Sequence, residues 1–354
     1  MKVLSIIGAR PQFVKEAIIQ YELDKHPDVQ EVVVHTGQHY DNNMSGIFFD
    51  VLNMRVPDYN LGISSSKHGE MTALMMIELE KVMIKEKPDI VLLYGDTNST
   101  LAGGLVASKL KIKTAHIEAG LRQEPKDMPE EINRQIVDRI SDYLFVPSKL
   151  GTDNLTKEGI TSNVYFVGDV MYDVYKKMEV KFDFTLIEDL KLSEDEYIVM
   201  TMHRDFNVDN KETLKNILYE INRISKEKKV VFPIHPRTIK RINEYKLGKY
   251  MKDILVIEPI DYLKLMGLTK NAFKIITDSG GYQKESYFSG KQACVIMPDT
   301  GWRELIDSGY NCLVDYSNVY DNIFKRSNEK RDPNVYGDGD AAQKIIKVLK
   351  NKLK

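Results

Sequence analysis

The sequence predicts an α/β protein made of two doubly wound parallel-sheet domains that face each other across a cleft. Its 354 residues exceed what one hydrophobic core usually organises, which favours two domains. Short β-branched runs alternate with longer helical patterns along the chain, and this alternation is typical of parallel strands joined by helices. Polar residues follow directly after these runs, where open parallel sheets bind their ligands.

Each apolar run predicts one strand. The runs of the first half are residues 3–7, 32–35, 90–94, 114–117, 143–146 and 164–167, and those of the second half are residues 197–200, 230–232, 254–257, 275–277 and 294–296. A charged stretch with little glycine, near residues 176–196, separates the two series. The tail from residue 341 to residue 354 predicts an amphipathic helix that crosses back onto the first domain. We therefore assign residues 1–172 plus 340–354 to an N-terminal domain and residues 173–339 to a C-terminal domain.

Composition narrows the classes of function. A formal net charge of -2, with 42% apolar and 29% charged residues, is typical of a soluble globular protein and argues against a nucleic-acid partner bound through its phosphates. The two cysteines, Cys294 and Cys312, cannot form a disulfide framework, which indicates a reducing compartment. The first apolar run is too short for a signal sequence or a membrane span, and no later run is longer. We expect a cytoplasmic protein with no membrane partner and no metal.

The residues after the predicted strands are unusually polar. In the first half they are Gly8-Ala9-Arg10, His35-Thr36-Gly37-Gln38-His39, Gly95-Asp96-Thr97-Asn98-Ser99 and Glu118-Ala119-Gly120-Leu121-Arg122. In the second half they are His203-Arg204, His235-Pro236-Arg237 and Asp278-Ser279-Gly280-Gly281. Turns are polar in any protein, but seven such clusters together predict a ligand site to which both domains contribute residues.

The segment from Asp278 to Glu285 follows a strand and enters a helix. Its glycines would let a phosphate approach the free amides of the helix start, so it predicts a diphosphate site, although Ser-Gly-Gly alone can be a simple turn. His203, Arg204 and Arg10 could add positive charge. Gly8 stands alone after the first strand, so no dinucleotide fingerprint is present and NAD-dependent chemistry is disfavoured; no cofactor is expected.

Three carboxylates could transfer protons: Asp96, Glu118 and Glu130. Asp96 ends an apolar strand in a Gly-Asp-Thr turn and is the strongest candidate. Glu130 follows Pro129, and proline followed by two glutamates is also an ordinary helix start.

These motifs resemble the non-hydrolysing UDP-N-acetylglucosamine 2-epimerases over nearly the whole chain. The segments that carry the resemblance include Ile7-Gly8-Ala9-Arg10-Pro11, Tyr94-Gly95-Asp96-Thr97-Asn98, His116-Ile117-Glu118-Ala119-Gly120, Pro129-Glu130-Glu131-Ile132-Asn133-Arg134, Thr201-Met202-His203-Arg204, His235-Pro236-Arg237-Thr238 and Thr277-Asp278-Ser279-Gly280-Gly281. The resemblance implies the two-Rossmann GT-B architecture and a homodimer. It also implies reversible elimination of UDP to a bound 2-acetamidoglucal, interconverting UDP-N-acetylglucosamine and UDP-N-acetylmannosamine for surface polysaccharide synthesis.

By motif match, the resemblance assigns a role to each candidate residue. Asp96, Glu118 and Glu130 match the acid and base carboxylates, and Lys15, Arg134 and His203 match other catalytic positions. Substrate-binding positions are Arg10, Gln38, His39, Arg204, His235, Ser279, Gly280, Gly281 and Glu285, with Glu285 expected on the ribose.

The chain departs from the family pattern at Phe206, Pro298 and Gly301, and Arg303 is displaced by one place. The segment His68-Gly69-Glu70-Met71-Thr72 looks more like epimerases of UDP-2,3-diacetamido-2,3-dideoxyglucuronate, which is the alternative substrate. A GT-B glycosyltransferase would share the Ser279-Gly280-Gly281 segment, and a hydrolysing epimerase would release free N-acetylmannosamine. A sugar-nucleotide-binding protein without activity is the non-enzyme alternative.

Overall fold

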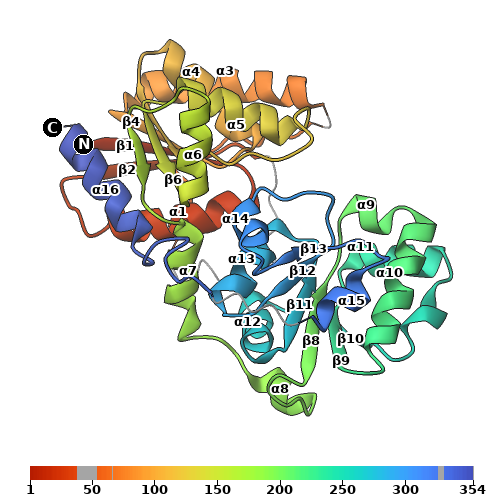
Figure 1. Ribbon diagram of the computed structural model, residues 1–354. Helices are drawn as coiled ribbons and strands as arrows, with labels where there is room; N and C mark the ends of the chain where they lie inside the picture. The colour runs from red at the N-terminus through yellow and green to blue at the C-terminus, as the bar shows by residue number, and fades with distance from the viewer. Residues whose placement is uncertain (38–53, 66, 326–330, 354) are drawn as a thin grey trace. The chain divides into compact units, whose positions relative to one another are not determined.

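The structure, a computed structural model, describes residues 1–37, 54–65, 67–325 and 331–353 (Figure 1). The chain divides into two compact units, Met1–Lys177 with Pro333–Lys354, and Met178–Asp332. Each unit holds one sheet in which every strand pair is parallel, with helices on both faces. The predicted α/β class with two doubly wound sheets is confirmed.

The first unit alternates strands and helices from its first residues. Its strands are β1 (Lys2–Ile7), β2 (Gln30–His35), β3 (Tyr59–Asn60), β4 (Ile90–Tyr94), β5 (Lys113–Ile117), β6 (Tyr143–Val146) and β7 (Val164–Phe166). Its helices are α1 (Arg10–Leu23), α3 (His68–Glu86), α4 (Asn98–Lys109), α5 (Pro129–Ile140), α6 (Lys149–Lys157), α7 (Val170–Glu179, whose last two residues belong to the second unit) and α16 (Ala341–Lys352).

Two helix layers cover the first sheet. Helices α3, α4 and α5 pack together on one face, and α1 and α16 lie side by side on the other (Figure 1). Leu4, Ile6 and Leu93 point from the strands into the α3–α4 layer and are fully buried. Burying one such side chain contributes roughly 1.5–3 kcal/mol, so this layer fixes the strand ends that carry the polar residues.

A buried carboxylate joins the tail of the chain to the first unit. Asp173, on α7, accepts hydrogen bonds from the amides of Ala341 (3.0 Å) and Ala342 (2.8 Å) at the start of α16. These amides have no partner inside their own helix, so the carboxylate supplies the acceptors that the helix start requires.

The second unit repeats the plan with shorter elements. Its strands are β8 (Tyr197–Thr201), β9 (Lys229–Pro233), β10 (Leu255–Ile257), β11 (Lys274–Thr277), β12 (Ala293–Val295) and β13 (Cys312–Leu313). Its helices are α8 (Thr185–Asp189), α9 (Asp205–Val208), α10 (Lys211–Ile224), α11 (Pro236–Glu244), the 3-10 turn η1 (Gly248–Met251), α12 (Tyr262–Asn271), α13 (Gly280–Phe288), α14 (Arg303–Asp307) and α15 (Val319–Ile323).

Strand order locates the ligand edge of each sheet. The first sheet runs β3-β2-β1-β4-β5-β6-β7 and the second runs β10-β9-β8-β11-β12-β13. In each, the order reverses between the first strand and its later neighbour, at β1/β4 and at β8/β11. Such reversal points are where doubly wound sheets open a crevice for ligands. Gly95 and Asp96 follow β4, and Asp278 follows β11, so the polar turns flank these two points.

The eleven strands predicted from the apolar runs are all present. The two-residue strands β3 and β13 were not predicted. Cys312, on β13, pairs in register with Cys294, and the two thiol sulfurs lie 3.4 Å apart as free cysteines. Among the described residues, no helix combines the length and the apolar character needed to cross a membrane.

Candidate active site

The turn after β1 is tied to the end of β4 by one glutamine. Gln12 Oε1 accepts the amides of Gly8 (2.8 Å) and Ala9 (3.0 Å), while its Nε2 donates to the carbonyl of Tyr94 (2.7 Å). Gln12 thereby fixes the start of α1 next to the end of β4, at the reversal point of the sheet. Arg10 is the first residue of α1; Gln38 and His39 lie outside the described residues.

Lys15 and Glu118 form a buried ion pair at this edge. Lys15 Nζ, from α1, lies 2.5 Å from Oε1 of Glu118, which follows β5. Glu118 has a φ of +74°, an uncommon conformation for a residue with a side chain. Its amide and that of Ala119 both donate to the carbonyl of Phe145 at 3.1 Å, which holds the turn in place. Strained backbone of this kind is concentrated at functional sites.

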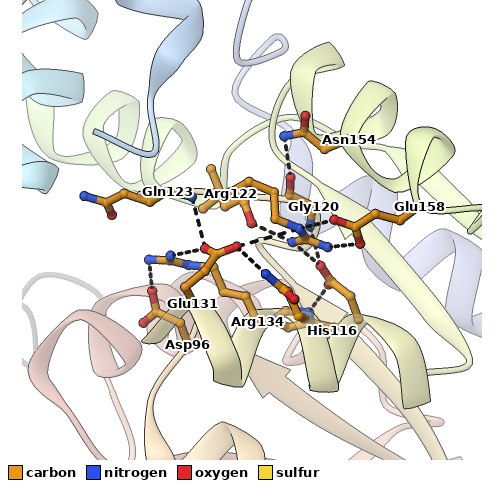
Figure 2. A network of polar contacts seen from close by, with 12 residues as sticks. Asp96, His116, Gly120, Arg122, Gln123, Glu131, Arg134, Asn154 and Glu158 are labelled. Atoms are coloured by element: carbon orange, nitrogen blue, oxygen red, sulfur yellow. Dashed lines mark hydrogen bonds and ion pairs between the residues drawn. The ribbon is translucent and has the colours of Figure 1, made fainter. Parts of the chain in front are cut away.

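Asp96 is held by Arg134. Arg134 Nη2 lies 2.5 Å from Asp96 Oδ2, and its Nη1 donates to Glu131 Oε2 at 2.8 Å (Figure 2). Burial alone would lower the pKa of the Arg134 guanidinium, but the two carboxylates outweigh burial and raise it. The Asp96 side chain remains 27% exposed, so a ligand can reach a carboxylate whose position is already fixed.

The two glutamates at the start of α5 differ in burial. Glu130 is exposed in the first turn of the helix, whereas Glu131 is buried and also accepts the amide of Gln123 (3.0 Å). Glu131 was not among the predicted site residues. Its spacing to Arg134 and to Asp138, three and seven residues along the helix, places all three on one face and was the available signal.

In the second unit, Asp278 organises the edge of the sheet. Its carboxylate accepts the amides of His203 (3.0 Å) and Arg204 (2.9 Å) and the side-chain amide of Asn207 (3.1 Å). Burial alone would raise the pKa of Asp278, but these hydrogen bonds and the His203 ring outweigh burial and hold it below the usual range. Asp278 is thus a structural anion that shapes the turn after β8.

Helix α13 begins at the predicted diphosphate site. Ser279 is its N-cap, and its hydroxyl accepts the amide of Tyr282 at 3.3 Å. A Cβ added to Gly281 would meet no atom within 4 Å, and the nearest atom to one on Gly280 would be Trp302 Nε1 at 3.9 Å. The first amides of the helix are therefore open to an anion. Glu285 lies one turn further and is half-buried.

Two histidines lie beside this helix start within the same unit. The rings of His203 and His235 are 5.4 Å apart, and His203 Nδ1 is 3.2 Å from Asp278 Oδ1. His235 is the N-cap of α11, where its Nδ1 accepts the amide of Arg237 at 3.1 Å. Arg204 is exposed. Burial and the neighbouring His203 lower the pKa of His235. The second unit thus places two imidazole rings beside the open amides.

The segment that departs from the family pattern packs onto α13. Thr300 Oγ1 donates to Gln283 Oε1 at 2.9 Å and accepts the amide of Trp302 at 3.2 Å. The Trp302 ring covers Lys284, whose Nζ lies 3.5 Å from the ring centroid. Phe206 and Pro298 are exposed. These contacts support α13 from its side without using a glutamate at position 301.

The two edges are suited to different chemistry. The first unit brings Lys15 to Glu118 and Arg134 to Asp96, and ion-paired carboxylates of this kind could transfer protons. The second unit brings His203 to the start of α13, which suits a diphosphate. That both act on one ligand across a cleft stays a prediction.

Two such units, one with ion-paired carboxylates at its strand ends and one with an open helix start, are typical of a nucleotide-sugar enzyme of the GT-B type. The chain belongs to the UDP-N-acetylglucosamine 2-epimerase family, whose pattern matches residues 21–350. It is an isomerase, a sugar-nucleotide 2-epimerase. Membership of this family decides against the glycosyltransferase alternative.

Known 2-epimerases align with this chain over nearly its full length. A UDP-N-acetylglucosamine 2-epimerase of Methanocaldococcus jannaschii is 43% identical, with 99% of each chain covered. A UDP-2,3-diacetamido-2,3-dideoxy-D-glucuronate 2-epimerase of Pseudomonas aeruginosa is 42% identical, again over 99% of each chain. The crystal structure of the Methanocaldococcus jannaschii UDP-GlcNAc 2-epimerase in complex with UDP-GlcNAc and UDP matches with a TM-score of 0.86 and 40% identity, covering 99% of this chain and 100% of that one.

Proposed function

We propose that the protein inverts carbon 2 of UDP-N-acetylglucosamine to give UDP-N-acetylmannosamine, and the reverse. Carbon 2 has no adjacent carbonyl to acidify its proton, so the departure of UDP from carbon 1 must drive proton removal. Elimination then gives 2-acetamidoglucal and UDP, and re-addition after protonation on the other face gives the epimer. Stabilising the departing diphosphate is therefore part of catalysis as well as of binding.

The proton-transfer roles fall to the first unit. Asp96, Glu118 and Glu130 are proposed as the acid and base groups on the two faces of the sugar ring. Asp96 and Glu118 are already oriented by Arg134 and Lys15, at 2.5 Å each. Ion pairs of this kind hold each carboxylate in a fixed position, which proton transfer to or from a substrate requires.

The diphosphate roles fall to the second unit. Ser279, Gly280 and Gly281 are proposed to bind the phosphates through the start of α13, with His203 and Arg204 adding positive charge and His235 contributing a hydrogen bond. Glu285, one turn along the same helix, is proposed to hold the ribose. Arg10, Gln38 and His39 are proposed as further substrate contacts from the first unit.

One observation carries the proposal. A relative that is 40% identical and matches with a TM-score of 0.86 was solved with UDP-GlcNAc and UDP bound. In this chain, the buried Lys15–Glu118 pair and the Asp96–Arg134 pair stand at the edge where such a sheet takes its ligand.

Proton NMR of the purified protein with UDP-N-acetylglucosamine in deuterated water tests the proposal. We expect formation of the manno epimer with deuterium at carbon 2 in both epimers. Steady release of free UDP with N-acetylmannosamine would point to hydrolysis instead. A sugar nucleotide that stays fully protonated at carbon 2 would refute the proposed substrate.

The diacetamido-glucuronate is the second candidate substrate, because the Pseudomonas aeruginosa relative is 42% identical over the same length. That substrate adds a carboxylate at carbon 6 and an acetamido group at carbon 3. The same NMR experiment with both sugar nucleotides separates the two. Exchange with the uronate alone would make it the substrate.

We further propose a cytoplasmic homodimer. Apolar side chains are exposed on the two helices of the first unit that pack against α4, with Leu74, Ile77 and Ile84 on α3 and Ile132 and Ile136 on α5. Exposed apolar clusters of this kind mark interaction surfaces. One chain has a mass of 40.7 kDa, and light scattering coupled to gel filtration should give twice that mass. Ile77→Lys should shift the mass toward the monomer, whereas Tyr219→Lys, an exposed apolar site of the second unit, should leave the dimer intact.

A further inference from the structure

His116 links the two turns that carry Asp96 and Glu118, although its side chain cannot reach a ligand. Its ring is fully buried on β5. Nε2 lies 2.7 Å from the carbonyl oxygen of Gly95, and Nδ1 lies 2.7 Å from Oδ1 of Asp138 on α5 (Figure 2). The ring therefore joins the strand β5, the turn before Asp96 and the helix α5.

The partners of the ring define its protonation. The Gly95 carbonyl can only accept, so Nε2 must donate. Asp138 accepts two further hydrogen bonds at its other oxygen, from the Gly120 amide (3.1 Å) and from Arg122 Nη1 (2.8 Å), and the charged guanidinium favours the ionised carboxylate. Burial alone would raise the pKa of Asp138, but His116 and Arg122 outweigh burial and lower it. Nδ1 must then donate as well, because a neutral ring would turn a lone pair toward that carboxylate.

The ring lies within a larger network of charged side chains. The network in Figure 2 holds four carboxylates and two guanidinium groups, which are Asp96, Glu131, Asp138 and Glu158, and Arg122 and Arg134. Arg122 alone contacts three of the acids: Asp138 at 2.8 Å, Glu158 at 2.6 Å and Glu131 at 3.9 Å. A third cation at His116 brings the cluster from a charge of -2 to -1, which lessens the cost of burying the anions.

We propose that His116 is a buried imidazolium and that its pair with Asp138 is the device that positions Asp96 and Glu118 for proton transfer. Through Nε2 it fixes the peptide before Asp96, where Gly95 has a φ of +62°. Through Asp138 it fixes the Gly120 amide, two residues after Glu118 with its φ of +74°. The conformation of Glu118 is uncommon for a residue with a side chain, so the Glu118 turn in particular needs such a restraint.

The inference rests on the proposed epimerase activity, but its first test does not use that activity. Protein labelled with nitrogen-15 in histidine should give a His116 ring with two protonated nitrogens at pH 7.5. In Asp138→Asn the ring should carry one proton only, at Nε2. A neutral His116 ring in the parent protein at pH 7.5 would overturn the proposal, whatever substrate the enzyme takes.

The second test separates positioning from simple structural support. We expect Asp138→Asn to lower kcat about 100-fold with little change in KM, because proton transfer groups contribute at least that much when they are aimed. Asp173→Asn is the matched control, since Asp173 is also buried, lies in the same unit and accepts two backbone amides. It should retain kcat. Equal losses of kcat in both variants, or no loss in Asp138→Asn, would overturn the positioning role.

If Asp138→Asn does not fold, His116→Gln replaces it. Glutamine can still donate one hydrogen bond to the Gly95 carbonyl but cannot donate to both partners. We expect the same fall in kcat with UDP binding unchanged by calorimetry. Wild-type kcat in this variant would overturn the proposal.

Discussion

The two sheets share one strand order, apart from an additional strand at the end of the first. The acidic residue at the reversal point nevertheless has a different role in each. Asp96 follows β4 and is 27% exposed, with its carboxylate paired to Arg134. Asp278 follows β11 and is fully buried, with its oxygens taken by the amides of His203 and Arg204. One acid is partly exposed and held by an arginine, and the other is buried and shapes a turn.

This difference comes from what surrounds each acid. In the first unit, helices α1 and α5 supply cations, Lys15 and Arg134, that reach the strand ends. In the second unit, helix α13 begins with Ser279 and two glycines and supplies open amides. The same architecture thus holds ion-paired carboxylates at the strand ends of one unit and an open helix start in the other, depending on which residues the helices place near the strand ends.

The largest expected effect is the loss of proton transfer from the first unit. Asp96→Asn and Glu118→Gln should each reduce exchange of the carbon 2 proton with solvent by about 10³-fold, within the range of general acid-base catalysis. Deuterium incorporation followed by NMR measures this rate. Affinity for UDP, measured by calorimetry, should stay the same, because the diphosphate is proposed to bind in the second unit.

Asp142→Asn is the matched control. Asp142 directly precedes β6 and pairs with the exposed Lys113 at 2.6 Å. Both residues lie at the amino ends of the strands, opposite to the ends that carry Asp96 and Glu118. The Asp142→Asn variant should exchange at the parent rate. Exchange at the parent rate in both Asp96→Asn and Glu118→Gln would remove the catalytic half of the comparison.

A smaller effect should follow from closing the anion site. Gly281→Ala adds a methyl group that meets no protein atom within 4 Å, so the fold should tolerate it. The methyl would occupy the space through which a phosphate approaches the amides, and we expect UDP affinity to fall about tenfold, or ~1.4 kcal/mol. Calorimetry measures the change. Gly248→Ala, also without a neighbour within 4 Å, should bind UDP as the parent does, and equal affinities in both variants would contradict the anion site.

The smallest effect concerns stability. Burial raises the pKa of Glu31 to about 7, with Asp24 and Asp58 adding to the rise against hydrogen bonding from Ser5 and the charge of Arg55. The folded protein thus holds a proton on Glu31 that the unfolded chain releases at lower pH, so this stability is present below about pH 4.5 and is lost as pH rises through 7.

Urea unfolding at pH 5.5 and pH 8 measures this effect. The parent should lose roughly 1–3 kcal/mol between the two values, and Glu31→Gln should lose less. Asp278, with its lowered pKa, has the opposite sign: its contribution is complete in this range and declines only on further acidification. An equal pH dependence in Glu31→Gln and the parent would show that Glu31 does not carry it.

The sequence predicted the strands and the polar turns because both depend on local patterns. The run Ile90–Tyr94 and the turn Gly95-Asp96 could be found without a structure, since β-branched residues mark buried strands and ligand residues follow them. Strand β13 could not be found, because two residues carry no periodicity.

The pairings within the site could not be predicted for a different reason. Lys15 and Glu118 are 103 residues apart in sequence, and only the sheet brings them together. In the sequence, Asp138 and His116 carry no sign of their pairing. Only the fold places one nitrogen of the His116 ring against Asp138 and the other against the Gly95 carbonyl. Glu131 was overlooked in favour of its neighbour Glu130, although its spacing to Arg134 and Asp138 on one helix face was visible.

The amide cap that Asp173 provides for α16 has a consequence for how the chain is made. The first unit is discontinuous, because residues 333–354 return to it after the whole second unit. During synthesis, the second unit can therefore fold as soon as residue 332 has emerged, while the first still lacks its closing helix. The half of the protein that is encoded first is the last to be completed.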